Sequence, residues 1–399
     1  MGRETDAVIL SAARTPIGKF QGGLSSMPAT RLGAVAVQAA VQRAAIAPAD
    51  IDEVIMGNVV QAGEGQAPAR QASVWGGIPT SVGATTINKV CGSGLKATML
   101  AAQAVRAGDG DLFVAGGFES MSRAPYLVSG RSGELKFGNQ PLTDALLQDG
   151  LWDPFEKWGM GEAAEFIADE YHITREAMDR FAFESHQRAI AAQESGAFSQ
   201  EIVAVEVSGR RGETLRVEKD EGPRKDTSLE SLAGLKPSFR TDGKVTAGNA
   251  SSMNDGAAAL VIASRAYAEN HRHRPMARVV GYAQAAVDPK YLFAAPAHAI
   301  PKLLKRIGWK MEDLDLIELN EAFAAQVLAD GKALADQGWD WQKVNIHGGA
   351  IALGHPLGAS GSRVLTTLLY ALKSRKLQRG LASLCLGGGE AVGMAIELE

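Results

Sequence analysis

The chain has 399 residues, of which 46% are hydrophobic and 22% charged, and its formal net charge is −4. This length exceeds what one hydrophobic core usually organises, so two domains, with room for an inserted third, are expected. The composition excludes a disordered chain and offers no basic surplus for binding nucleic acid. No apolar run approaches the roughly 18 residues of a membrane span and no signal peptide precedes the first strand, so we expect a cytoplasmic protein without a membrane partner.

The first 120 residues alternate β-branched runs with helical patterns. Strands are expected over residues 7–10, 53–60, 85–90 and 111–115. Helices are expected over residues 29–45 and 95–107. Gly116-Gly117 should close the last of these strands. This alternation is typical of βαβ units, and it predicts an α/β protein with a mostly parallel sheet.

From residue 119 to residue 246 the chain becomes richer in charge, glycine and proline. Two helical patterns, 162–171 and 175–194, interrupt an otherwise irregular segment. We therefore expect an inserted loop domain here. The strand pattern resumes over 257–263, and a second half begins near Pro275.

The second half repeats the order of helix and strand seen in the first. Ser93-Gly94 opens a helix that leads to the strand DLFVAGG, and Ser360-Gly361 opens a helix that leads to LASLCLGGG. Such self-similarity predicts a duplicated unit. If the copies pack about a pseudo-two-fold axis, equivalent loops converge on one cleft, and both cysteines face it together with the GHPLGASG segment.

The chain has only two cysteines, Cys91 and Cys385. Cys91 stands where a helix begins, and the positive end of the helix dipole should lower the pKa of its thiol and make it nucleophilic. A buried structural role is the commoner one for an isolated cysteine, because cysteine packs as a small hydrophobe. His355 favours a catalytic role for Cys91 over a structural one, because its imidazole can accept the thiol proton. The glycines after Cys385 can offer backbone N–H groups to an oxyanion, and Cys385 itself can act as an acid or base.

Seven motifs, read in order, carry a family resemblance: SAARTPIGKF, NKVCGSGLKA, GGFESMS, VTAGNASSMNDGAAA, NEAFA, GGAIALGHPLGASG and CLGGG. Over essentially its whole length the chain resembles the thiolase family, and within it the short-chain acetyl-CoA acetyltransferases. The resemblance implies an α/β fold of duplicated αβα layers, five in all (αβαβα), with an inserted loop domain. It divides the chain into an N-terminal half (1–118 and 247–273), a loop domain for CoA binding and oligomer contacts (119–246) and a C-terminal half (274–399).

The resemblance also implies a reaction, the reversible Claisen condensation of two acetyl-CoA molecules to acetoacetyl-CoA and CoA. Cys91 would carry the acyl group after His355 accepts its proton, and Cys385 would move the α-proton of the second acetyl-CoA. Asn320 would hold a water that forms one oxyanion hole with His355. The N–H groups of Cys91 and Gly387 would form the other. No metal and no cofactor besides the CoA thioesters is expected.

For CoA itself, the resemblance assigns Ser251 to the pantetheine arm, and Arg224 and Ser231 to the nucleotide. The expected tunnel lining is Leu151, Met160, Ala247, Phe239 and Phe323. Arg224 on a solvated face and Phe323 in the core are the plainer alternatives. The family also implies a homo-oligomer, either a dimer or a tetramer, with contacts from the region after GGFESMS.

Two other functions stay open. Acetoacetyl-CoA members usually place a histidine just before the methionine of the loop domain, where this chain has Gly159 before Met160. A degradative 3-ketoacyl-CoA thiolase of broader chain length is therefore an alternative. The other is a thiolase-fold protein that binds acyl-CoA without turnover, which the retention of all four catalytic side chains disfavours. His271 and His273 are expected to form a solvated turn, not a metal site.

Overall fold

The computed structural model describes residues 4–128, 130, 133, 137–208 and 213–399. Within them, one sheet has the strand order β14-β15-β16-β13-β1-β12-β5-β3-β4, with β2 attached to β12. Its strands are β1 (Ala7–Arg14), β2 (Gly18–Lys19), β3 (Glu53–Gly57), β4 (Gly83–Ile87), β5 (Leu112–Ser120), β12 (Asn254–Ser264), β13 (Ala277–Ala286), β14 (Leu316–Leu319), β15 (Arg379–Leu386) and β16 (Glu390–Leu398).

The prediction of a mostly parallel sheet is wrong. In the described part of the chain, β3 pairs in parallel with β4 and β5, and β14 with β15, whereas the main pairings around β1, β12, β13 and β16 are antiparallel. The reason lies in two returning strands. β16 follows β15 through a tight glycine turn, which forces a hairpin, and β12 comes back from the loop segment to lie between β1 and β5.

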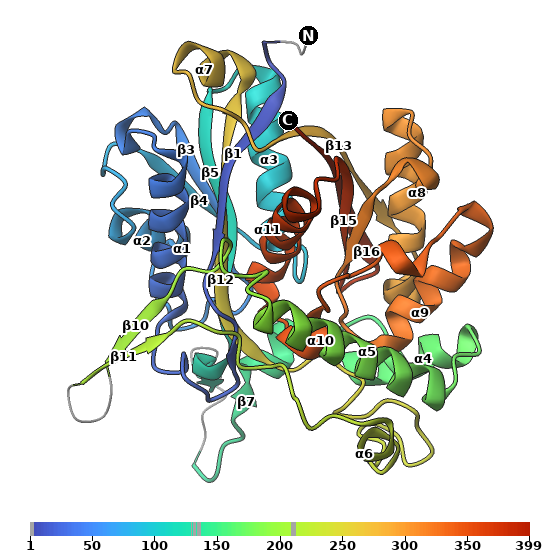
Figure 1. Cartoon of the computed structure of the whole chain (residues 1–399). Helices are drawn as coiled ribbons and strands as arrows, with labels where there is room; N and C mark the ends of the chain where they lie inside the picture. Colours follow the sequence, from blue (N-terminus) through green and yellow to red (C-terminus); the bar gives the residue numbers. More distant parts are fainter. Residues whose placement is uncertain (1–3, 129, 131–132, 134–136, 209–212) are drawn as a thin grey trace.

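Helices cover the outer faces of the sheet and also lie between its N-terminal and C-terminal strands (Figure 1). They are α1 (Ala29–Ala44), α2 (Pro68–Trp75), α3 (Ser93–Ala107), α7 (Arg265–Asn270), α8 (Pro296–Ile307), α9 (Ala324–Ala333), α10 (Ala350–Leu353) and α11 (Leu357–Arg375). Helices α1 and α2 lie outside the N-terminal strands, α8 and α9 lie outside the C-terminal strands, and α3 and α11 lie between the two sets. These are the five layers of the predicted αβαβα fold.

The two halves repeat one strand pattern outward from their junction. They join where β1 pairs with β13 through Val8–Arg278 and Ile9–Ala277. From that junction the N-terminal half runs β1, β12, β5, β3 and the C-terminal half runs β13, β16, β15, β14. Both series pair antiparallel, antiparallel and then parallel. The predicted duplication is confirmed by this matching order.

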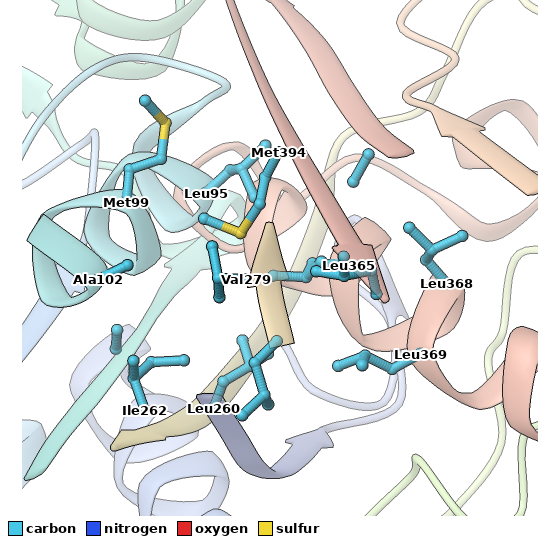
Figure 2. Packing of buried hydrophobic residues seen from close by; sticks show 14 of the residues in the cluster. Leu95, Met99, Ala102, Leu260, Ile262, Val279, Leu365, Leu368, Leu369 and Met394 are labelled. Atoms are coloured by element: carbon cyan, nitrogen blue, oxygen red, sulfur yellow. The ribbon is translucent and has the colours of Figure 1, made fainter. Parts of the chain in front are cut away.

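The central layer is the contact between α3 and α11 (Figure 2). Leu95 and Met99 of α3 pack with Leu365 of α11 and Met394 of β16 in one buried apolar cluster. The backbones approach closely where the helices begin, because a Cβ on Gly361 would lie 2.2 Å from the backbone nitrogen of Leu95. The serine-glycine pairs that marked the sequence repeat are therefore a place where the backbones of the two central helices approach closely.

The segment between β5 and β12 lies along one side of this core. Its helices are α4 (Met160–Glu170), α5 (Arg175–Glu194) and α6 (Leu229–Ala233), and its short strands are β6 (Tyr126–Leu127), β7 (Thr143–Asp144), β8 (Trp152–Asp153), β9 (Trp158–Gly159), β10 (Val205–Ser208) and β11 (Thr214–Val217). A buried ionic cluster ties it to β1. Arg14 donates to Glu201 at 2.6 Å and to both carboxylate oxygens of Asp220 at 2.7 and 2.9 Å.

Candidate active site

Three chain segments deliver the predicted reactive side chains to one cavity of about 580 Å³. Cys91 comes just before α3, His355 just before α11, and Cys385 near the end of β15. All three side chains line the cavity together with Gly387, which follows β15. The cleft expected from the duplicated loops thus exists, and the start of one central helix faces the start of the other across it.

The turn that presents Cys91 is tightly fixed. Val90 has φ of 45°, a left-handed conformation that is strained for a β-branched residue. Asn88 Oδ1 accepts from the Val90 N–H at 2.9 Å, and Ser93 Oγ accepts from the Lys89 N–H at 2.8 Å and donates to the Val90 carbonyl at 2.7 Å. These three bonds hold the strained backbone and set the thiol at the start of the helix.

The expectation that the helix start lowers the pKa of Cys91 is wrong. Burial raises the pKa of the thiol from 9.0 to about 12, and the charge of Glu119 adds to the rise. The backbone N–H groups of Gly387 and of Cys91 itself oppose it, since they hydrogen-bond the sulfur and favour its charged form. Cys91 is therefore a thiol at rest, and a base must take its proton before it can act as a nucleophile.

His355 is held in the tautomer that such a base requires. Its Nδ1 lies 2.6 Å from Ser360 Oγ, and that hydroxyl donates its only hydrogen to the Pro356 carbonyl at 2.8 Å. With the hydroxyl hydrogen on the Pro356 carbonyl, Ser360 Oγ accepts from Nδ1–H, which assigns the lone pair to Nε2. Nε2 has no hydrogen-bond partner in the part of the chain that the structure describes. Burial, and then the charge of Arg363, lower the pKa of the imidazole to about 3, so the ring is neutral and free to accept a proton.

Two buried side chains fix the backbone around His355. Asn254 Oδ1 accepts from the His355 N–H at 3.0 Å. Glu119 accepts from the Gly358 N–H at 2.9 Å and from the N–H groups of Val59 and Val60 at 3.0 and 3.1 Å. Burial raises the pKa of Glu119 to about 7. The start of α11 is thus anchored to β12, to the end of β5 and to the loop after β3.

Cys385 occupies a drier position than Cys91. It is 1% exposed and packs in an apolar cluster with Phe293, Phe323 and Ile351. Burial raises the pKa of its thiol well above the ordinary value, and the neighbouring Cys91 and Asp330 add to the rise. A group that binds its proton this strongly is a strong base once it has lost it.

Most of the residues expected to contact substrate line the same cavity. These are Leu151, Met160, Arg224, Phe239, Ala247, Ser251 and Phe323. Ser231 and Asn320 are not part of its wall. Ser231 sits in the first turn of α6, where its hydroxyl donates to the Ser228 carbonyl at 2.9 Å. Asn320 is 1% exposed, and its Oδ1 accepts from Arg363 Nη2 at 3.4 Å.

The residues that orient the site were not predicted from the sequence. Glu119, Asn254 and Ser360 all stand in quoted motifs, GGFESMS, VTAGNASSMNDGAAA and GHPLGASG. The available signal was a polar residue inside an otherwise small or apolar motif. Their roles depend on contacts between residues far apart in the chain, such as Asn254 with His355. His186 accepts from the Arg224 N–H at 3.2 Å and lines the cavity, but it lies in none of the seven motifs.

In the described ranges, no group of three or more His, Cys, Asp or Glu side chains is arranged to hold a metal ion. None of the helices in that same part of the chain has the length and apolarity to cross a membrane.

The cavity combines a thiol on a helix start, a neutral imidazole with a free lone pair, a second buried thiol and two N–H groups that meet at the first sulfur. In a duplicated five-layer fold, these parts define a cysteine-dependent acyl-transfer enzyme.

Comparisons with known proteins agree with that class. The thiolase N-terminal domain family matches residues 7–266 and the thiolase C-terminal domain family matches residues 273–398. An acetyl-CoA acetyltransferase of Cupriavidus necator is 51% identical over 98% of this chain and 99% of that protein. Acetyl-CoA acetyltransferase 2 of Arabidopsis thaliana is 50% identical over 98% and 97%. The crystal structure of the Bacillus anthracis acetyl-CoA acetyltransferase has a TM-score of 0.95 at 42% identity and covers 99% of both chains. The chain belongs to the thiolase family.

Proposed function

We propose that the protein is an acetyl-CoA C-acetyltransferase, which condenses two acetyl-CoA molecules reversibly to acetoacetyl-CoA and CoA. The observation that carries this proposal is the pairing of the two cysteines with His355 in one cavity, in a chain about half identical to acetyl-CoA acetyltransferases. No metal or cofactor takes part in the scheme below, and the CoA thioesters are the substrates.

In the first step Cys91 takes the acetyl group. His355 Nε2 accepts the thiol proton, and the Cys91 sulfur attacks the carbonyl carbon of acetyl-CoA. The N–H groups of Cys91 and Gly387 hold the oxyanion of the tetrahedral intermediate, because they already point at the sulfur to which that carbon bonds. The C–S bond to CoA then breaks, and the leaving CoA thiolate takes its proton from Cys385.

In the second step Cys385, now a thiolate, removes the α-proton of a second acetyl-CoA. Asn320, through a water, and His355 stabilise the enolate oxygen. The enolate carbon attacks the acetyl group on Cys91, forms the new C–C bond and releases Cys91 as a thiolate. The Cys91 thiolate takes back the proton held by His355, and Cys385 keeps the α-proton. Both cysteines are thiols again, so the cycle closes without another reactant.

The apolar wall suits the pantetheine arm of CoA. We assign the arm to Ser251 and the channel around it to the five wall residues Leu151, Met160, Phe239, Ala247 and Phe323. We assign Arg224 to the nucleotide. Ser231, outside the wall, meets only those parts of the nucleotide that extend beyond the cavity. We also propose the division of the chain at residues 118, 246 and 273, with the segment 119–246 as the CoA-binding loop domain.

We propose a homo-oligomer, a tetramer or a dimer, that works in the cytoplasm in lipid metabolism. Tyr126, Leu142 and Phe155 in the loop segment are 65%, 62% and 63% exposed, an unusual amount of apolar surface for a free monomer. The two free thiols fit a reducing compartment. Sedimentation equilibrium measures the assembly, and a monomer at micromolar concentration contradicts it.

A broader-chain 3-ketoacyl-CoA thiolase is the second candidate, because Gly159 leaves room beside the cavity. A Cβ at Gly159 would meet nothing closer than Glu162 Oε2 at 3.5 Å, so this wall can admit more than a methyl group. Thiolysis of four-carbon and longer 3-ketoacyl-CoA substrates separates the candidates. Comparable kcat/KM for long chains favours the broader enzyme.

The mechanism is tested with two cysteine variants and acetyl-CoA. Cys91→Ala should form no acetyl-enzyme, which intact-protein mass spectrometry detects as a missing mass increase. Cys385→Ser should still acetylate but condense at least about 100-fold more slowly, because a hydroxyl is a far poorer proton carrier at neutral pH. Wild-type turnover in Cys385→Ser removes Cys385 from the proton-transfer role.

A further inference from the structure

Arg363 is a buried cation that the mechanism above does not use. It lies on α11, later on the helix that His355 precedes, and is 2% exposed. Its Nη1 faces Glu318 Oε2 at 3.8 Å, and Glu318 is itself 2% exposed. Within the described ranges, neither Nε nor Nη1 of Arg363 has a hydrogen-bond partner. Burying a guanidinium with so few hydrogen bonds destabilises the folded state. A contribution to stability therefore does not explain Arg363, which points to a role in the site.

The contact that distinguishes Arg363 is with Asn320. Nη2 of Arg363 donates to Asn320 Oδ1 at 3.4 Å. The Asn320 backbone is fixed separately, since its N–H donates to the Ser383 carbonyl at 3.0 Å. What remains undetermined is which end of the side-chain amide faces which way. A guanidinium can only donate, so it selects the oxygen and leaves the NH₂ group on the opposite side. That Asn320 Nδ2 has no partner among the described residues.

We propose that Arg363 is a positioning residue, which orients the Asn320 amide so that its N–H groups, and not its oxygen, are offered to the enolate-stabilising water. The inference rests on the proposed function, because it gives Asn320 its task in the condensation step. Without the guanidinium the amide can turn over, and an acceptor then replaces the donor where negative charge develops.

The guanidinium of Arg363 also favours the neutral form of the His355 imidazole, which the mechanism requires. The charge of Arg363 helps to lower the pKa of His355, which keeps the ring neutral. Glu318 offsets part of the buried charge, and Arg363 in turn limits the rise in the pKa of Glu318, which burial raises to about 8. Arg363 thus serves the site without contacting substrate.

A double-mutant cycle tests the inference in the full-length enzyme with Arg363→Met, Asn320→Ala and the double variant. Arg363→Met should lower kcat for condensation about 10- to 100-fold with KM changed less than about 3-fold, because the lost donor acts on the developing charge. Acetyl-enzyme formation should persist. In the Asn320→Ala background the Arg363 substitution should cost almost nothing further. Losses that multiply in the double variant overturn the inference.

Two controls separate positioning from folding. Arg363→Lys keeps a donor and should recover part of the lost kcat, whereas a purely structural role predicts recovery of the unfolding midpoint without recovery of kcat. Arg106→Met removes an arginine of α3 that donates to the Val279 carbonyl at 2.6 Å and does not line the cavity, and it should leave kcat unchanged. If Arg363→Met does not fold, the cycle is run with Arg363→Lys. A parent protein that forms no acetyl-enzyme would contradict the proposed function, whereas multiplicative losses in an active parent contradict only the role of Arg363.

Discussion

At Cys91, burial and the helix start act in opposite directions on one thiol. A helix terminus stabilises a charge by about 0.3–1 kcal/mol. One pKa unit corresponds to about 1.4 kcal/mol, so this effect offsets less than one unit of a rise from 9.0 to about 12. The sequence shows where the helix starts but not how dry the surroundings are. That is why the direction of the pKa change could not be predicted, although the position of the nucleophile could.

The tautomer of His355 gives a prediction at the same scale. In Ser360→Ala the buried Nδ1–H loses its acceptor, and leaving a buried donor unpaired costs about 1–3 kcal/mol. We expect the rate of acetyl-enzyme formation to fall about 10- to 100-fold, because the ring no longer holds its lone pair on Nε2 toward Cys91.

Stopped-flow acetylation with acetyl-CoA measures this loss. Ser362→Ala is the matched control, since Ser362 is also a buried serine of α11 but donates to the Ala359 carbonyl at 2.9 Å instead of serving His355. Equal acetylation rates in Ser360→Ala and the parent would show that Ser360 does not fix the imidazole.

Among secondary-structure elements, the sequence predicted local features well and long-range ones poorly. Helix α5 begins and ends where its pattern predicted, because Thr174 caps it and its apolar positions are helically spaced. Strand β5 was expected to stop at Gly116-Gly117 but continues to Ser120. A Cβ at Gly117 would lie 2.0 Å from the Gly358 carbonyl oxygen. These glycines admit a neighbouring backbone, and only the tertiary structure reveals which one.

The crossing of α3 and α11 is tested by Gly361→Ala. The new Cβ would lie 2.2 Å from the Leu95 nitrogen, so the helices must move apart. Overpacking of this kind costs about 1–3 kcal/mol of unfolding free energy, and the movement should also lower kcat about 10-fold or more by separating Cys91 from His355.

Urea unfolding and steady-state kinetics measure both effects. The matched control is Gly83→Ala on β4, where an added Cβ meets nothing within 4 Å. A Gly361→Ala enzyme with normal kcat would show that the site tolerates displacement of its two helices.

The ionic cluster between β1 and the loop segment is tested by Arg14→Met. This change leaves Glu201 and Asp220 buried without their counter-charge, and breaking a buried pair in this way costs about 3–5 kcal/mol. Arg216→Met is the control, because Arg216 and Glu218 are 68% and 55% exposed and such a pair contributes less than about 1 kcal/mol. Urea unfolding that fails to distinguish the two variants contradicts the role of the cluster.

For the whole molecule, acidification should destabilise the fold through buried neutral histidines. Burial against Phe198 and other neighbours lowers the pKa of His347 from 6.5 to about 4. Below pH 6.5 the unfolded chain binds this proton before the folded chain does. The contribution is therefore intact above about pH 6.5 and is lost as the pH falls toward 4.

His347→Gln removes this titration. Between pH 7.5 and pH 4.5 the variant should lose roughly 1–2 kcal/mol less unfolding free energy than the parent, after discounting for the solvated part of the ring. Comparing variant with parent cancels the opposite contribution of acids such as Glu119, whose pKa is raised to about 7. Parallel pH profiles of unfolding free energy in the two proteins would show that His347 does not take part.

The sequence repeat predicted the duplication and the shared cleft, and the family resemblance implied the five layers. They did not predict which polar residues anchor that cleft. Asn320 was assigned from its motif alone, yet its orientation depends on Arg363, which no motif reading had singled out.

The contact between Gly94 and Gly361 regions makes turnover a report on complete folding. Cys91 comes from one half and His355 from the other, so the thiol and its base share one cavity only after the two helix starts have docked. A half-folded chain therefore lacks the pairing of thiol and imidazole that acetylation needs. The close contact of the two helix starts thus serves both the packing of the core and the assembly of the site.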